Sequence, residues 1–379
     1  MKIAHFITTA GLYGAERWVL SFLTHAIKHD SHKFLLICTS SDNQELVELA
    51  RERQIKCYIL PTKHNFDLTS AIRQLRQLIK KEDVDILHSH GYKSDIIGYL
   101  ASRSTGSKTL STPHGWDLQS GIKVRCYNWL DRQVLRFFDR VVPLSKPLAK
   151  TLSMIPGHNL SVINNHIDLE ELPNPDSGDP FLISYVGRLT RLKRVEDIIR
   201  ALSDCDSRVR LQIIGEGPER QTLELLTQKL GLQQRVSFLG YRADRLALLN
   251  QSRIFVLPSS SEGTSRSMME AMALGKIVIG SNIAGNRVLV QAGKTGYLFP
   301  VGDVSALHAQ LQNTLKSPQL NALVSRNARD LIYQAFSAQS VVLQYLEVYT
   351  VLSRQKKQPR KEEISIAKYT NTENDSHDG

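Results

Sequence analysis

The 379-residue sequence contains few cysteines, and they follow no recognisable pattern. The four, Cys38, Cys57, Cys126 and Cys205, lie far apart and include no Cys-x-x-Cys pair. This scatter argues against a disulfide framework or a zinc site and predicts buried thiols in a reducing compartment. No apolar run approaches the ~20 residues that span a bilayer, and polar residues interrupt the N-terminal segment too early for a signal peptide. These absences predict a cytoplasmic protein.

Acidic residues are also too few to balance the basic ones. The chain has 48 lysines and arginines against 37 aspartates and glutamates, a formal net charge of +11. Such an excess favours an anionic partner, such as a nucleotide diphosphate, a nucleic acid or an anionic membrane surface. The usual nucleic-acid modules, such as paired Cys/His spacings or an aromatic RNA-binding strand, are missing, so we expect no nucleic-acid partner.

Short apolar segments alternate with helical periodicity along most of the chain. Strands are expected at 3–8, 34–38, 56–60, 86–88, 108–111 and 140–143, and again at 181–186, 210–214, 236–239, 254–257, 276–280 and 296–299. Helices are expected at 15–26, 44–53, 68–80, 94–103, 195–202, 218–230, 244–251, 267–274, 284–292 and 304–316, with a final one at 338–352. This rhythm predicts an α/β protein whose parallel sheets are doubly wound, and a chain of this length predicts two such domains.

The expected domain boundaries follow from composition. Residues 172–180 are rich in Pro, Gly and Asp and read as a linker between an N-terminal domain, 1–171, and a C-terminal domain, 181–337. A helix at 338–353 is expected to pack back on the N-terminal domain. The tail 354–379 begins basic, ends acidic and is expected to be disordered.

The sharpest motif is the string from Pro258 to Gly275, which leaves an expected strand, crosses a loop of small residues and enters a helix. In open α/β sheets ligands bind outside the carboxyl ends of the strands. Backbone N–H groups at this helix start can hold a diphosphate, aided by the helix dipole. Glu262 can accept hydrogen bonds from sugar hydroxyls, and Glu270 can bind the two hydroxyls of a ribose. A structural alternative stays open, because Ser267-x-x-Glu270 also fits a capping box.

A second motif places two cations after the strand 181–186. Arg188 and Lys193, five residues apart, can neutralise a diphosphate as the leaving group gains charge. The alternative is a solvated basic loop, since Arg191 and Arg194 lie nearby.

Together these motifs resemble the retaining glycosyltransferases of the GT-B fold, specifically glycosyltransferase family 4. Glu262 and Glu270 with seven residues between them, followed by Ala-Met-Ala-x-Gly, carry the resemblance, which extends over roughly residues 3–352. It implies two Rossmann-like domains facing each other across a cleft. It also implies a nucleotide-sugar donor such as a UDP- or GDP-sugar, a glycan or lipid-linked acceptor, and no metal or other cofactor.

The resemblance assigns further residues to the site. The donor would contact Gly11, Gly14, Arg188, Lys193, Gly215, Gly217, Glu262, Gly263, Thr264, Ser265, Arg266 and Glu270. Tyr13, His90 and His114 would lie on the acceptor side, and His114, Glu262, Arg188 and Lys193 are the catalytic candidates. Simple turns are the alternative for the glycines; for Gly215 and Gly217 that turn would be left-handed. His88 and His90 are expected on opposite sides of a strand, and so to form a poor metal site.

Two departures from the family pattern stand out. His166 follows Asn165 where a glycine is common, and Val288 stands where an acid is common, so that Arg287 is a substitute candidate. The predicted function is sugar transfer from a nucleotide-sugar, in cell-surface polysaccharide or lipopolysaccharide synthesis at the inner face of the membrane. Three alternatives remain open at this point: a nucleotide-sugar epimerase or hydrolase, a Rossmann oxidoreductase, and a non-catalytic subunit of the same fold.

Overall fold

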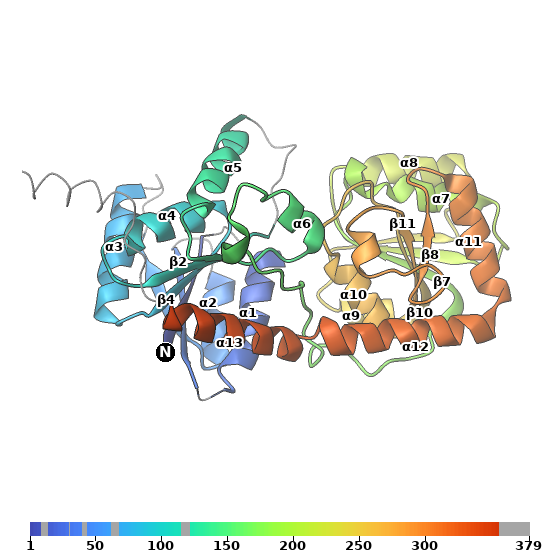
Figure 1. Ribbon diagram of the computed structural model, residues 1–379. Coiled ribbons are helices and arrows are strands. Elements are labelled where there is room, and N and C mark those ends of the chain that lie inside the picture. Colours follow the sequence, from blue (N-terminus) through green and yellow to red (C-terminus); the bar gives the residue numbers. More distant parts are fainter. Residues whose placement is uncertain (9–13, 30, 40–43, 62–67, 115–121, 356–379) are drawn as a thin grey trace, which may run out of the picture.

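The computed structural model describes residues 1–8, 14–29, 31–39, 44–61, 68–114 and 122–355. These residues form two parallel six-stranded sheets, each with helices on both faces (Figure 1). No helix among them combines the length and the apolar character needed to cross a bilayer.

The first sheet has the strand order β3-β2-β1-β4-β5-β6. Its strands are β1 (Lys2–Ile7), β2 (Lys33–Thr39), β3 (Lys56–Leu60), β4 (Ile86–His90), β5 (Lys108–Ser111) and β6 (Arg140–Val141). Its helices are α1 (Gly14–Ala26), α2 (Gln44–Glu52), α3 (Leu68–Lys81), α4 (Tyr92–Ser102), α5 (Ile122–Leu135) and α6 (Lys146–Lys150), with a 3-10 turn η1 (Gly157–Asn159). The central strands are buried on both faces, which explains their nearly continuous apolar sequences.

The second sheet has the order β12-β11-β10-β7-β8-β9, which repeats the order of the first. Its strands are β7 (Asp179–Val186), β8 (Arg210–Ile214), β9 (Val236–Gly240), β10 (Ser252–Leu257), β11 (Ile277–Ser281) and β12 (Tyr297–Phe299). Its helices are α7 (Val195–Ser203), α8 (Arg220–Lys229), α9 (Arg245–Gln251), α10 (Arg266–Ala273), α11 (Val304–Lys316) and α12 (Pro318–Ala335), with 3-10 turns η2 (Arg191–Lys193) and η3 (Asn286–Val288).

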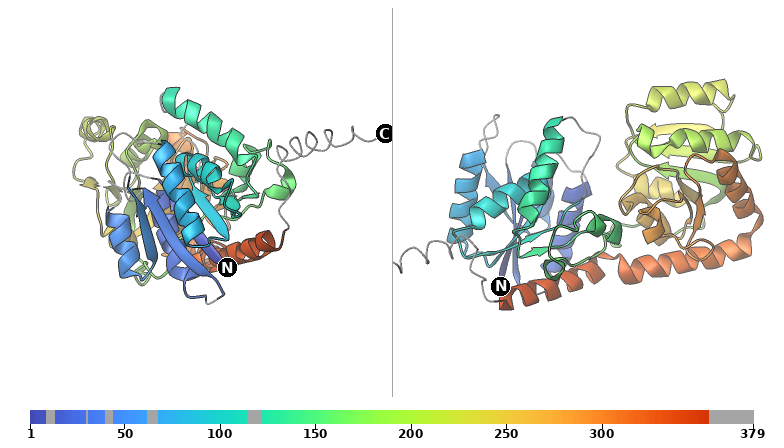
Figure 2. Two further views of the ribbon diagram at one scale, coloured as in Figure 1. Left: turned by 90° about the vertical axis from the view of Figure 1, so that its left-hand side faces the viewer. Right: turned by 45° about the horizontal axis from the view of Figure 1, so that its top comes forward.

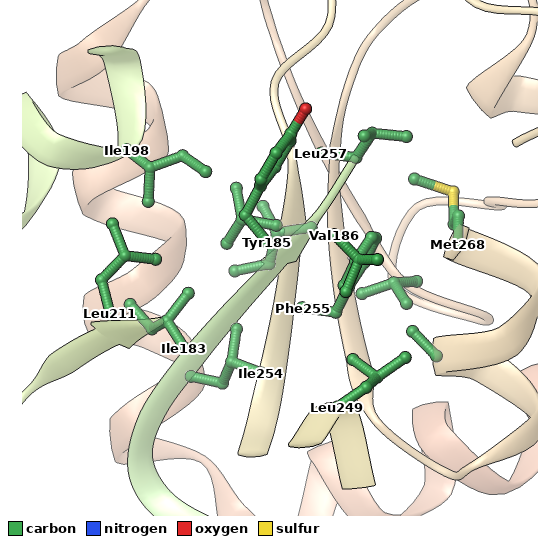
Figure 3. Packing of buried hydrophobic residues seen from close by; sticks show 14 of the residues in the cluster. Ile183, Tyr185, Val186, Ile198, Leu211, Leu249, Ile254, Phe255, Leu257 and Met268 are labelled. Atoms are coloured by element: carbon green, nitrogen blue, oxygen red, sulfur yellow. The ribbon is translucent and has the colours of Figure 1, made fainter. Parts of the chain in front are cut away.

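Each sheet is fixed by its own hydrophobic core. In the second half, residues from β7, β8 and β10 interdigitate with Ile198 of α7 and Met268 of α10 (Figure 3). In the first half, one face of the sheet packs on α1, α2 and the last helix, α13 (Ala338–Arg354), and the other face packs on α3 and α4. The doubly wound α/β fold inferred from the sequence is therefore correct.

The chain crosses between the halves twice, and the two crossings run side by side. Ile167 pairs with Phe336 and Ala338 through backbone hydrogen bonds of 3.0 and 2.9 Å. Beyond this point α13 leaves the second half and lies along the first, against α1 (Figures 1 and 2). The C-terminal helix is therefore part of the N-terminal half in space.

Three local expectations were wrong. The segment 284–292 contains only the short 3-10 turn η3 rather than a helix. The strand β7 begins at Asp179, inside the expected linker. Cys126 is exposed and Cys57 only half-buried, so burial of all four thiols does not hold, although all four are free.

Candidate functional site

The two sheets share a strand order that reverses direction at β1/β4 and at β7/β10. Such a switch point leaves an opening at the carboxyl edge of the sheet, because the two following connections leave in opposite directions. In the second half, the loop after β7 carries Arg188 and Lys193, and the loop after β10 carries Glu262. The topology therefore brings both sequence motifs to one edge.

Lys193 and Glu262 are in direct contact across this switch point. The Lys193 ammonium donates to Glu262 Oε1, and Ser259 Oγ donates to the same oxygen at 2.9 Å. The two loops are also joined by their backbones, since the N–H of Ser260 donates to the carbonyl of Leu192 at 2.8 Å. The carboxylate and the ammonium are thus held in place before any ligand binds.

Arg188 precedes Lys193 in the loop after β7 and is exposed. Within the described ranges, its guanidinium has no hydrogen-bond or ion-pair partner, while its backbone carbonyl accepts from the Tyr185 hydroxyl at 3.1 Å. The backbone of Arg188 is therefore held in place, and its guanidinium is available to bind an anion.

Gly215 combines a positive φ with close backbone packing, whereas Gly217 serves close backbone packing alone. Gly215 has φ +144°, and a Cβ there would lie 1.9 Å from the carbonyl oxygen of Gly187. A Cβ on Gly217 would lie 2.2 Å from the carbonyl oxygen of Leu189. Only glycine lets the loop after β8 press against the loop that carries Arg188.

The loop after β11 packs on the Glu262 loop from the other side. A Cβ on Gly285 would lie 2.3 Å from the carbonyl oxygen of Glu262, so this position also requires glycine. Val288 packs against the hydrophobic core, which an acid could not do. Arg287 is exposed and donates to Asn282 Oδ1 at 2.8 Å.

Helix α10 begins at Arg266, and its N-cap is Ser265, whose hydroxyl accepts from the N–H of Met268 at 3.4 Å. The capping box of Ser267 with Glu270 is therefore wrong, because Ser267 already lies inside the helix. Gly263 has open space around its Cβ direction, and the buried Thr264 hydroxyl has no partner among the described residues. The start of α10 keeps polar groups available for a ligand.

Glu270 is buried and held by two arginines. Arg245 of α9 forms a bidentate pair with its carboxylate, at 2.8 and 3.0 Å, and Arg266 Nε donates to Oε1 at 3.0 Å. Arg266 also approaches Glu171 at 3.7 Å. A carboxylate fixed by such a fork is oriented toward the start of α10 rather than free to rotate.

In the first half, His90 ends β4 and His114 follows β5, and the two imidazoles meet at 3.3 Å. Gly14 is the first residue of α1, and a Cβ there would contact nothing within 4 Å. Gly11 and Tyr13 lie outside the described residues. The two histidines are thus brought together at the carboxyl ends of adjacent strands.

The expectation that His88 and His90 point to opposite sides was wrong. Residues two apart on a strand share a face, and the ring centroids of these two lie 4.2 Å apart. His5 of β1 joins them, so that nitrogen atoms of three buried imidazoles lie within 4.8 Å of one another. Three imidazoles can ligate a metal such as zinc; here, however, their ring nitrogens are hydrogen-bonded to protein groups.

Trp18 connects this cluster to His166, near the end of the first half. Its ring centroid lies 5.3 Å from that of His90, 5.5 Å from that of His114 and 4.9 Å from that of His166. His166 is buried, and neither of its ring nitrogens has a partner among the described residues. Burial lowers the pKa of His166 well below its usual value, and the charge of Arg266 lowers it further.

A backbone contact closes the same junction. The side chain of Asn165 donates to the carbonyl of Thr264 at 3.2 Å, which ties the end of the first half to the loop before α10. The candidate residues of both halves therefore meet around His166 and Thr264.

Sequence reasoning missed several members of this site. Arg245, His5 and Trp18 belong to no motif, and His166 was noted only as a departure from the family pattern. The signal available in the sequence was the presence of histidines in the apolar strands β1 and β4. When two such strands are parallel neighbours, polar residues at paired positions lie side by side.

Comparison with known proteins agrees with this arrangement. Residues 13–171 match the family described as Glycosyltransferase Family 4, and residues 170–331 match Glycosyl transferases group 1. The chain is 29% identical over 301 residues to N-acetyl-alpha-D-glucosaminyl L-malate synthase of Bacillus anthracis, covering 75% of this chain and 79% of that protein.

It is 28% identical over 369 residues to UDP-Gal:alpha-D-GlcNAc-diphosphoundecaprenol alpha-1,3-galactosyltransferase of Escherichia coli, covering 89% and 93% of the two chains. Among solved structures, Anabaena Alr3699/HepE in complex with UDP superposes with a TM-score of 0.80 at 21% identity, covering 93% of this chain and all of that one. Family matches across both halves and the shared fold lead to one conclusion: the chain belongs to the GT-B glycosyltransferases of family 4.

Proposed function

We propose that this glycosyltransferase transfers a sugar from a UDP-sugar to a lipid-linked glycan acceptor, with retention of anomeric configuration and without a metal ion. The observation that carries the proposal is the Lys193–Glu262 pair at the carboxyl edge of β7 and β10, together with Arg188 of the same β7 loop, whose guanidinium has no partner among the described residues. Fixed cations at this edge suit a diphosphate, and a fixed carboxylate suits sugar hydroxyls. The UDP-galactose named for the Escherichia coli relative and the UDP bound to Anabaena HepE favour uridine over guanosine.

The site residues divide the reaction between them. Arg188 and Lys193 hold the diphosphate, the start of α10 contributes N–H groups, and Glu270 receives the ribose. The bond from the anomeric carbon to the phosphate oxygen breaks, and its electron pair moves to the diphosphate. The acceptor hydroxyl oxygen bonds to the same face of that carbon, and its proton passes to the leaving phosphate oxygen. Positive charge around the diphosphate stabilises the charge that develops there.

Calorimetric titration tests the donor site. Purified protein is titrated with UDP, GDP, ADP and NAD in the presence of EDTA. UDP should bind most tightly, and Arg188→Ala should weaken it by about tenfold, the loss of one charge-assisted contact. Arg210→Ala is the matched control, because Arg210 starts β8 at the opposite edge of the sheet and pairs with Asp179. Preference for NAD, or equal losses in both variants, would contradict the proposal.

Turnover tests the reaction itself. With a UDP-sugar and a polyprenyl-diphosphate-linked sugar, NMR of the product should show the donor's anomeric configuration, and EDTA should leave the rate unchanged. Free sugar or an altered sugar formed without acceptor would instead identify a hydrolase or an epimerase. Loss of turnover in EDTA that added Mg²⁺ restores would refute metal independence.

We further propose that helix α5 contacts the cytoplasmic face of an anionic membrane, where a lipid-linked acceptor would be found. Helix α5 stands out from the first half (Figure 1), and Trp129 on it and Phe137 just after it are 64% and 62% exposed. The exposed Arg136 lies beside Phe137, and the chain carries a net charge of +11. Exposed aromatic and basic side chains together suit an anionic interface.

Vesicle sedimentation tests this contact. Vesicles with phosphatidylglycerol should bind the protein, and the double variant Trp129→Ser/Phe137→Ser should lose most of this binding. Leu320→Ser/Leu323→Ser is the control, because these leucines of α12 are 50% and 54% exposed in the other half. Equal binding by both variants would show that α5 is not the contact.

A further inference from the structure

Seven buried or half-buried polar side chains form a single chain of hydrogen bonds between the candidate site and helix α13. In order they are His114, His90, His5, Tyr349, His88, Thr112 and Tyr345, with consecutive separations of 3.3, 3.0, 3.2, 2.7, 2.8 and 2.8 Å. All except His114 are at most 2% exposed. The proposed function uses His114 and leaves the rest of the chain unexplained.

We propose that Tyr349 is a positioning residue: it carries a one-way chain of hydrogen bonds that holds His114 as the Nδ1–H tautomer, ready to donate to the bound substrate. The tautomer follows from the apo structure alone. Its use in catalysis rests on the proposed function, in which His114 lies beside the transferred sugar.

The four imidazoles are neutral at physiological pH. Burial lowers the pKa of His5 to about 3 and that of His114 to about 4, and it lowers those of His88 and His90 well below their usual value. A neutral imidazole has one N–H and one unprotonated nitrogen. Each histidine in the chain therefore donates on one side and accepts on the other, and a direction set at one end passes to the other end.

The hydroxyl end of the chain, Thr112 with Tyr345, sets that direction, because each hydroxyl hydrogen there needs an acceptor. Among the described residues, Thr112 Oγ1 is the only hydrogen-bond partner of the buried Tyr345 hydroxyl. If Tyr345 donates to Thr112, the Thr112 hydrogen must go to His88 Nε2, its other partner. If Thr112 donated to Tyr345 instead, the Tyr345 hydrogen would have no acceptor. An unpaired buried donor disfavours that arrangement by on the order of tenfold to a hundredfold.

The remaining protons are then determined. His88 accepts at Nε2, so it donates from Nδ1 to the Tyr349 oxygen. The Tyr349 hydrogen goes to His5 Nε2, and His5 donates from Nδ1 to His90 Nε2.

The last link is the one that reaches the site. His90 donates from Nδ1 to His114 Nε2, which leaves the hydrogen of His114 on Nδ1. That atom has no hydrogen-bond partner among the described residues. His114 accordingly presents a donor, suited to a sugar hydroxyl or phosphate oxygen, and not a general base.

Nitrogen-15 NMR of the full-length protein with labelled histidine tests this assignment at pH 7.5. His114 should show a protonated Nδ1 and an unprotonated Nε2. The reverse pattern in wild-type protein would overturn the inference and would leave sugar transfer intact. Metal found in the purified protein and bound to His5, His88 and His90 would also overturn it, because the metal would take nitrogens that the chain uses.

Two tyrosine variants distinguish the one-way chain of hydrogen bonds from simple packing. Tyr349→Phe removes the link to His5, so His114 should become a mixture of tautomers, and kcat/KM should fall by about two- to tenfold with the competent fraction. Tyr345→Phe is the matched control: it removes an equally buried hydroxyl from the same helix, but Thr112 still needs His88 as its acceptor.

Tyr345→Phe should therefore keep the Nδ1–H pattern and the wild-type rate. A mixture in Tyr345→Phe, or an unchanged pattern in Tyr349→Phe, would refute the one-way chain. The wild-type spectrum decides the tautomer even where a variant fails to fold. An Nδ1–H tautomer in a protein without turnover would instead count against the proposed function.

Discussion

Four fully buried histidines predict that this protein loses stability in mild acid. For His5, His88, His90 and His166, burial holds the folded-state pKa far below the ordinary value of 6.5. The unfolded chain therefore binds more protons than the folded one, and stability rises with pH. The contribution is present above about pH 6.5 and is lost as the pH falls towards the folded-state values.

The size of the loss follows from linkage. Between pH 7 and pH 5.5 a histidine that stays neutral in the folded protein costs about 1 kcal/mol, so four cost about 4 to 5 kcal/mol. Asp95 acts in the opposite direction, because burial and the neighbouring Asp131 raise its pKa well above the usual range. Burial also raises the pKa of Glu196, which acts in the same direction as Asp95, whereas burial lowers the pKa of His114 to about 4 and adds to the loss. These two nearly offset each other, which leaves a net loss of about 2 to 5 kcal/mol, a large part of the roughly 5–15 kcal/mol that stabilises a typical domain.

Urea unfolding at pH 5.5, 6 and 7, followed by tryptophan fluorescence, measures this loss. Trp18 lies among the histidines and reports on their surroundings. His166→Gln removes one ionisable group without removing any hydrogen bond of the described structure, and it should reduce the loss by about 1 kcal/mol. A loss below about 1 kcal/mol in wild-type protein would refute the buried, neutral cluster.

Three further changes test the remaining physical arguments. Gly217→Ala should lower the free energy of unfolding by about 1–3 kcal/mol, because the new Cβ would lie 2.2 Å from a backbone oxygen. Gly157→Ala is the control: its Cβ would meet nothing within 4 Å, so the free energy of urea unfolding should hardly change. Asp95→Asn should stabilise the protein more at pH 8 than at pH 5, because a carboxyl with a raised folded-state pKa contributes stability that is lost as the pH rises. Equal changes in the free energy of unfolding at both pH values would contradict this prediction. Arg245→Ala should cost about 1–3 kcal/mol by thermal or urea unfolding, while Arg242→Ala, whose pair with Asp244 is exposed, should cost at most about 1 kcal/mol.

The fold was predictable because its signal is local. Apolar runs of strand length alternate with helical periodicity, and this pattern fixes element type before any tertiary contact is known. The helices α5 and α12 were nevertheless missed. Helix α12 carries a signal that could have been used, with Pro318 at its first turn and buried residues Val324, Ala328 and Ile332 at helical spacing. Where the expected helix 284–292 failed, Gly285 had to approach another loop closely, and that demand lies outside the local sequence.

The candidate site was also predictable only in part, for residues that belong to local motifs. Lys193, Glu262 and Glu270 belong to motifs, and the structure places the first two in contact. The partners that hold the site were not predictable, because they come from distant segments: the hydrogen bond between His5 and Tyr349 joins residues 344 positions apart. The capping-box alternative for Glu270 failed because the N-cap of α10 is Ser265, two residues before Ser267.

The two halves bring opposite electrostatics to the same junction. In the second half the side chains that hold the site are ion pairs: Lys193 with Glu262, and Arg245 and Arg266 with Glu270. In the first half the groups are neutral imidazoles and hydroxyls. Charge is useful where a diphosphate must be held, whereas a sugar needs neutral donors with fixed directions.

This division also requires the histidines to stay neutral. A proton on His166 would face the positive charge of Arg266, which already lowers the His166 pKa. A proton shared along the imidazole chain would remove the lone pairs that fix its direction. Burial of the histidines beneath α13 therefore costs stability in acid, and it keeps a directional hydrogen-bond donor beside a strongly cationic site.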